Sequence, residues 1–129
     1  MSNTLNGLKV VVIDDSSTIR RSAEIFLSQV GCQVLLAEDG FDALAKINDH
    51  NPNIIFCDIL MPRLDGYQTC ALIKKSPKFS SIPVIMLSSK DGLFDRARGR
   101  MVGSDEYLTK PFTKDTLLEA VRIHSQAQS

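Results

Sequence analysis

Acidic residues follow two apolar runs at the point where each run ends. Asp14 and Asp15 come directly after Lys9–Ile13 (KVVVI), and Asp58 comes directly after 54–57 (IIFC). A carboxylate at the end of an apolar strand is costly to desolvate unless water, a metal ion or a cationic side chain meets it. Taken alone, Asp58 could be an ordinary turn residue, so the rest of the chain has to decide between a turn and a site.

Two further polar residues end later runs that are predicted as strands. Ser88 closes 84–88 (VIMLS), and Lys110 follows 106–109 (EYLT). Separately, Ser88 could begin a Ser-Ser-Lys turn, and Lys110 could be an exposed residue before Pro111. Together they add a hydroxyl and a compact ammonium group, which suit a phosphate or carboxylate partner. Three acids, a hydroxyl and a lysine, all at the carboxyl ends of four predicted strands, indicate a site.

The elements that must position these residues alternate regularly along the chain. Strands are predicted at 9–13, 33–37, 54–57, 84–88 and 106–109. Helices are predicted after the Ser16-Ser17 cap, after the Asp39-Gly40 turn, from Asp65, over about 93–101 and after the Thr113 cap. The second helix is expected to bury the side that is straddled by Phe41, Leu44, Ala45 and Ile47–Asn48. The alternation predicts an α/β fold, a doubly wound five-stranded parallel sheet in strand order 2-1-3-4-5 with five flanking helices.

This strand order places the first and third strands side by side at the switch point, where ligands bind at the carboxyl ends of strands. We therefore expect Asp14, Asp15 and Asp58 at one edge of the sheet. Two carboxylates about 4 Å apart repel by about 4 kcal/mol at an effective dielectric constant of about 20. A hard divalent cation would relieve this repulsion, and Mg²⁺ takes carboxylates, waters and a phosphate oxygen. Zinc is disfavoured, because no His stands at a strand end, and His50 and His124 are predicted to be solvated.

Composition indicates one ordinary domain over 1–129. Lys and Arg number 15, and Asp and Glu number 15, so no net charge draws the chain to nucleic acid or to a membrane surface. The sequence has no signal-peptide core and no apolar run of membrane-spanning length. Cys32, Cys57 and Cys70 lack CxxC spacing and are expected to be buried, reduced thiols in a cytoplasmic protein.

Four motifs, VVVIDDS, DILMPRLDGY, PVIMLSSK and YLTKPF, resemble the receiver domains of response regulators (CheY-like). The resemblance extends from end to end of the chain. It implies that Asp58 is the phosphoryl acceptor. It also implies that Asp14, Asp15 and Asp58 hold Mg²⁺ together with the backbone carbonyl of Leu60.

The same resemblance implies roles for the residues at the later strand ends. Ser88 would bond the phosphoryl group, and Lys110 would pair with it. Tyr107 would be the aromatic residue that turns inward as Ser88 shifts. The Lys110–Pro111 peptide would be cis, which is plausible because only peptides before proline readily adopt that form.

The implied function is that of a single-domain response regulator in a two-component, chemosensory phosphorelay. A CheA-type histidine kinase or a histidine-phosphotransfer domain would phosphorylate Asp58, and the chain would signal through protein contacts as a monomer. It would turn over no separate substrate, so we do not expect an enzyme in the conventional sense. The blocks MPRLDGYQTCALIK and VGSDEYLTKPF resemble regulators of type IV pilus twitching motility, which implies the pilus machinery or its regulators as the downstream target.

No output domain is expected, so the signal should pass to another protein that binds the chain. The expected binding face is formed by the fourth helix, the fifth strand and the fifth helix. Its basic residues are Lys90, Arg96, Arg98 and Arg100. An acidic partner would fit these charges, but Asp91 and Asp95 lie nearby, so a merely solvated basic face stays open. The resemblance to receiver domains also implies that Leu60 and Lys90 flank the approach of the hydrolytic water. Because Leu60 cannot orient that water, we expect slow loss of the phosphoryl group.

Three other classes of protein fit the sequence less well. A Mg²⁺-dependent phosphatase with an aspartyl-phosphate intermediate would need an acid where Leu60 stands. A flavodoxin-like binder would need a Gly-rich phosphate loop, whereas DDSSTIRR is acidic at that point. A receiver that signals by binding alone would be expected to have lost one of the acids. A chemotaxis-type receiver acting on another target stays open.

Overall fold

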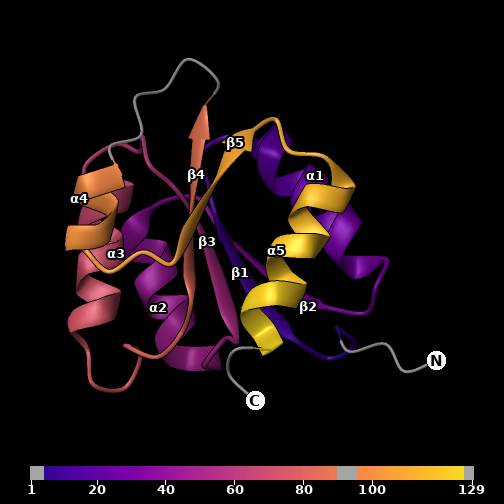
Figure 1. Ribbon diagram of the computed structural model, residues 1–129, viewed down its shortest axis with the longest axis horizontal. Coiled ribbons are helices and arrows are strands. Elements are labelled where there is room, and N and C mark those ends of the chain that lie inside the picture. Colours follow the sequence, from indigo (N-terminus) through magenta and orange to yellow (C-terminus); the bar gives the residue numbers. More distant parts are fainter. Residues whose placement is uncertain (1–4, 90–95, 127–129) are drawn as a thin grey trace.

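The computed structural model describes residues 5–89 and 96–126 (Figure 1). The elements follow one another as β1 (Lys9–Ile13), α1 (Ser17–Ser28), β2 (Gln33–Ala37), α2 (Gly40–His50), β3 (Ile54–Asp58), α3 (Gly66–Lys75), β4 (Val84–Ser89), α4 (Arg96–Met101), β5 (Glu106–Lys110) and α5 (Lys114–Gln126). The strands form one parallel sheet in the order β2-β1-β3-β4-β5. The predicted fold class and strand order are therefore confirmed.

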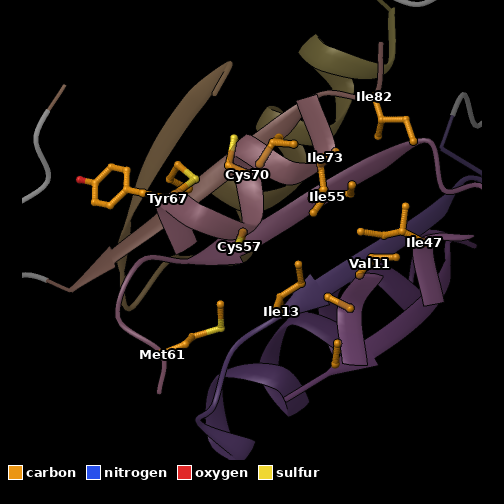
Figure 2. Packing of buried hydrophobic residues seen from close by; sticks show 14 of the residues in the cluster. Val11, Ile13, Ile47, Ile55, Cys57, Met61, Tyr67, Cys70, Ile73 and Ile82 are labelled. Carbon is orange, nitrogen blue, oxygen red and sulfur yellow. The ribbon is translucent and has the colours of Figure 1, made fainter. Parts of the chain in front are cut away.

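Each central strand alternates its side chains between two cores, one on either face of the sheet. On β1, Val10 and Val12 face the core under α1 and α5, whereas Val11 and Ile13 face the core under α2 and α3. Figure 2 shows Ile13 and Cys57 from adjacent strands within the second core. This two-sided burial explains why the strands read as continuous apolar runs.

The helices cover the sheet in two layers, with α1 and α5 on one face and α2, α3 and α4 on the other (Figure 1). Four of them begin at side-chain caps: Ser16 for α1, Asp39 for α2, Asp65 for α3 and Thr113 for α5. Asp65 forms a capping box with Gln68, which fixes the start of the helix that follows β3.

The expected buried side of α2 was partly wrong. Phe41 is 57% exposed and Ala45 is exposed, and the helix instead buries the stripe Gly40, Ala43 and Ile47. These positions lie three and four residues apart, so they share one face, and Phe41 is one step outside it. An exposed Phe at this helix start is therefore compatible with a well-packed helix.

Other expectations differ in detail. β3, β4 and β5 each extend one residue beyond the predicted end, because Asp58, Ser89 and Lys110 still pair in the sheet. Of the predicted fourth helix, 93–95 lie outside the described residues. His124 is not fully solvated, since its Nε2 lies 3.1 Å from Glu106 Oε1 and its side chain is 15% exposed. The Lys110–Pro111 peptide is cis, as expected.

The three cysteines are free and buried, as predicted. Burial raises the pKa of all three thiols, that of Cys70 to about 11. Within residues 5–89 and 96–126, no helix combines the length and the apolar character needed to cross a bilayer.

Candidate functional site

The sheet register brings the three predicted acids together. Ile13 pairs with Cys57, so Asp14 and Asp58 are the next residues along neighbouring strands. One carboxylate oxygen from each of Asp14, Asp15 and Asp58 lies within 4.8 Å of the others. Asp14 and Asp58 are buried, and Asp15 is exposed to solvent. Two buried carboxylates this close need a positive partner.

Lys110 supplies part of that positive charge. Its Nζ lies 3.0 Å from Asp14 Oδ2 and 3.0 Å from Asp58 Oδ1, and its side chain is only 14% exposed. The ammonium reaches the acids from the end of β5, two strands away from β3 in the sheet. One ammonium against three ionised carboxylates leaves the cluster with a net charge of about −2.

The electrostatics of the cluster set the charge on Asp58. Burial raises its pKa from 3.8, the Asp14 carboxylate raises it further, Lys110 lowers it and Asp15 adds a small increase, giving a pKa of about 6. Burial tends to lower the pKa of Lys110, but its bonds to Asp14 and Asp58 outweigh that effect and raise the pKa above its usual value. Above about pH 6, Asp58 is therefore an anion facing a permanent ammonium.

Asp14 is held more firmly than the sequence indicated. Its Oδ1 accepts from the Ser16 amide at 2.9 Å, and its amide donates to the Ala37 carbonyl at 3.1 Å. Arg20, which the sequence analysis did not select, donates from Nη1 to the Asp14 carbonyl at 2.6 Å. The available signal was its position one turn after the Ser16 cap, because helical side chains point back toward the N-terminus.

The remaining predicted site residues lie on β4, on β5 and just after β3. Asp58 pairs with Leu87, so Ser88 lies one residue beyond it on β4; its buried Oγ donates to the Ser89 carbonyl at 3.2 Å. Leu60 follows two residues after Asp58, and its side chain is 69% exposed. Tyr107 on β5 is half-buried, and its hydroxyl accepts a hydrogen bond from Arg96 on α4. Lys90 lies outside the described residues.

The donor set suits a hard divalent cation. The three clustered acids offer only carboxylate oxygens, and Asp15 makes no ion pair within the described part of the chain. Oxygen donors of this kind fit Mg²⁺ better than Zn²⁺, which prefers nitrogen and sulfur. The residues therefore fit the metal that the sequence predicted.

Comparison with known proteins agrees with this geometry. Residues 10–122 match the response regulator receiver domain. The chain is 69% identical over 124 residues to Protein PilG of Pseudomonas aeruginosa, covering 96% of this chain and 92% of PilG. Among solved structures, chemotaxis protein CheY4 of Vibrio cholerae is similar with a TM-score of 0.86 and 30% identity, covering 91% of this chain and 98% of CheY4. A putative response regulator from Chloroflexus aurantiacus reaches a TM-score of 0.88 at 28% identity, covering 94% of this chain and 99% of that one. The motifs, the topology and these likenesses establish that the chain belongs to the family of response regulator receiver domains.

Proposed function

We propose that this receiver domain is phosphorylated on Asp58 by a histidine kinase and passes the signal on by binding another protein. The observation that carries the proposal is the cluster in which the Asp14 and Asp58 carboxylates share the Lys110 ammonium beside the exposed Asp15. A buried carboxylate next to a fixed cation and a hard-cation donor set is suited to accept a phosphoryl group.

The chemistry follows from the charges at the site. An Asp58 carboxylate oxygen attacks the phosphorus of a phosphohistidine, an oxygen–phosphorus bond forms, and the phosphorus–nitrogen bond to the histidine breaks. Mg²⁺ held by Asp14, Asp15, Asp58 and the Leu60 carbonyl would neutralise charge on the transferring group. Lys110 already lies 3.0 Å from Asp58 and can follow the new phosphoryl oxygens.

Ser88 is placed to respond to the product. An aspartyl phosphate carries about two negative charges and three strong acceptor oxygens. The Ser88 hydroxyl, now bonded to the Ser89 carbonyl, can rotate to donate to one of them. In our proposal, this rotation draws the end of β4 toward Asp58 and frees Tyr107 to turn inward.

The proposed output face comprises α4, β5 and α5. A hollow between α4 and β5 is lined by Arg96, Arg100, Ser104, Asp105, Glu106 and Tyr107. The two acids of this hollow already contact basic side chains of the same domain. Asp105 forms an ion pair with Lys74 at 2.9 Å, and Glu106 contacts His124. The exposed guanidinium of Arg100 makes no ion pair with any described residue. The balance of charge favours an acidic protein surface as partner.

The biological setting is inferred from likeness. The identity of 69% to PilG, together with the motifs noted in the sequence, supports a role in type IV pilus twitching motility. We propose a cytoplasmic, single-domain regulator that acts as a monomer between a CheA-type kinase, or a histidine-phosphotransfer domain, and the pilus machinery or its regulators.

Incubation with acetyl phosphate and Mg²⁺, followed by intact-protein mass measurement, tests the proposal. The wild-type protein should gain one phosphoryl group only when Mg²⁺ is present. Asp58→Asn should gain none while keeping a folded circular dichroism spectrum. Equal labelling of Asp58→Asn and wild type would contradict the assignment of the acceptor.

A further inference from the structure

Two arginines of α4 lie over tyrosine rings that belong to two different neighbouring elements, β5 and α3. The Arg96 Cζ lies 5.1 Å from the centre of the Tyr107 ring on β5, and the Arg98 Cζ lies 4.3 Å from the centre of the Tyr67 ring on α3. Positions two residues apart point in nearly opposite directions from a helix. α4 therefore contacts the sheet through Arg96 on one side and α3 through Arg98 on the other.

The contact on the α3 side combines stacking with charge. Besides lying over Tyr67, Arg98 places Nη2 3.8 Å from Asp65 Oδ2. Tyr67 is 5% exposed, and Figure 2 shows its ring at the border of the core with the hydroxyl pointing away from the other labelled side chains. Arg98 therefore covers the rim of the core at the first turn of α3.

That first turn is packed directly on the backbone of Asp58. The Gly66 amide donates to the Ile59 carbonyl at 2.8 Å. A Cβ added at Gly66 would lie 2.2 Å from the Asp58 carbonyl oxygen, so no side chain fits between them. A shift of the Asp58 backbone must therefore move the start of α3, and with it the two partners of Arg98.

We infer that Arg98 is a positioning residue that ties α4 to the Asp58 backbone through Tyr67 and Asp65, and that this tie favours the unphosphorylated arrangement. The inference rests on the proposed function, because it concerns how the state of Asp58 reaches α4. It describes a connection through α3, separate from the one through Ser88 and Tyr107. A contact made in one of two arrangements biases the equilibrium toward that arrangement, and its removal favours the other.

Titration with Mg²⁺ and beryllofluoride, which stands in for the phosphoryl group, tests the inference. Arg98→Ala should bind beryllofluoride about threefold to tenfold more tightly than wild type, the range expected for losing one partly exposed stacked cation. Arg98→Lys, which keeps the charge but not the planar stack, should fall between them. Arg21→Ala is the charge-matched control, because the Arg21 side chain on α1 is 75% exposed, and it should stay within about twofold of wild type.

A second measurement uses the two tyrosines, Tyr67 and Tyr107, which are the only ones in the chain. With 3-fluorotyrosine incorporated, each gives one fluorine resonance, assigned with Tyr67→Phe. Beryllofluoride should move the Tyr67 resonance in wild type and in Arg21→Ala. The shift should be much smaller in Arg98→Ala, because that variant has no guanidinium over the ring to move away.

Different results of these experiments would refute the role of Arg98 alone or the proposed function as a whole. If wild type binds beryllofluoride but Arg98→Ala binds equally or more weakly, the tie is refuted and the phosphoacceptor proposal stands. An unmoved Tyr67 resonance in liganded wild type would also refute the tie. If wild type fails to bind beryllofluoride at all, the proposed function falls, and the inference falls with it.

Discussion

Replacing Asp58 with Asn should stabilise the metal-free protein at neutral pH. Asp58 is buried beside Asp14, and its pKa is raised from 3.8 to about 6. The folded protein therefore binds this proton more tightly than the unfolded chain does. Between these two pKa values, the folded state holds more protons than the unfolded state, so the free energy of unfolding falls as the pH rises.

The pKa difference sets the size of the effect. Moving from 3.8 to about 6 corresponds to about 3 kcal/mol of destabilisation once Asp58 is fully ionised. An Asn at this position keeps an oxygen that can accept from Lys110, which now bonds Asp58 Oδ1 at 3.0 Å. Because that neutral bond is weaker than the ionic one, we expect Asp58→Asn to gain about 1–3 kcal/mol at about pH 7.5 and almost nothing at about pH 4.

Urea unfolding in EDTA at these two pH values measures both numbers. Asp15→Asn is the matched control, because Asp15 is exposed and has the smallest of the named influences on the pKa of Asp58. It should change the free energy of unfolding by much less than Asp58→Asn. The reasoning is refuted if Asp58→Asn is no more stable than wild type at about pH 7.5, or if its gain is equally large at about pH 4.

Three further predictions follow from the same site and the same face. Millimolar Mg²⁺ should raise the melting temperature of wild type by relieving carboxylate repulsion, and should raise that of Asp58→Asn less; calorimetry showing equal shifts would contradict a site that includes Asp58. Leu60→Asn should shorten the lifetime of the phosphoryl group, because an amide can orient the attacking water; a lifetime measured by phosphate release that stays equal or lengthens would count against this role. Reversing the charge at both Arg96 and Arg100 should weaken binding to an acidic partner and reduce its salt dependence, whereas unchanged affinity in surface plasmon resonance would leave the basic face as solvated surface.

The strand ends could be predicted because their signal is local. A run that is followed by Asp14, Asp58 or Lys110 indicates a strand, and the polar residue marks the end of that strand at the edge of the sheet. Alternation of strands and helices then leaves few topologies, and the one expected places Asp14 beside Asp58, as the register shows. Capping residues such as Asp65 act within four residues of their own position, so the helix starts could also be predicted from the sequence.

Contacts between distant elements could not be predicted from the sequence. The stacking of Arg98 on Tyr67 depends on the packing of α4 against α3, which no local pattern determines. The pairing of His124 with Glu106 likewise needs the placement of α5 over β5. Phe41 lies one step outside the buried stripe of α2, and the residue type alone does not distinguish that position from one on the stripe.

Borohydride trapping of the phosphorylated protein tests the central claim most directly. Borohydride reduces an aspartyl phosphate to homoserine, and peptide mass spectrometry then locates the modified residue. After reaction with a phosphorylated histidine donor and Mg²⁺, homoserine should be found at position 58, with Asp14 and Asp15 intact. Homoserine at position 14 or 15, or at no position in a protein that accepts phosphate, would contradict the assignment of Asp58 as the acceptor.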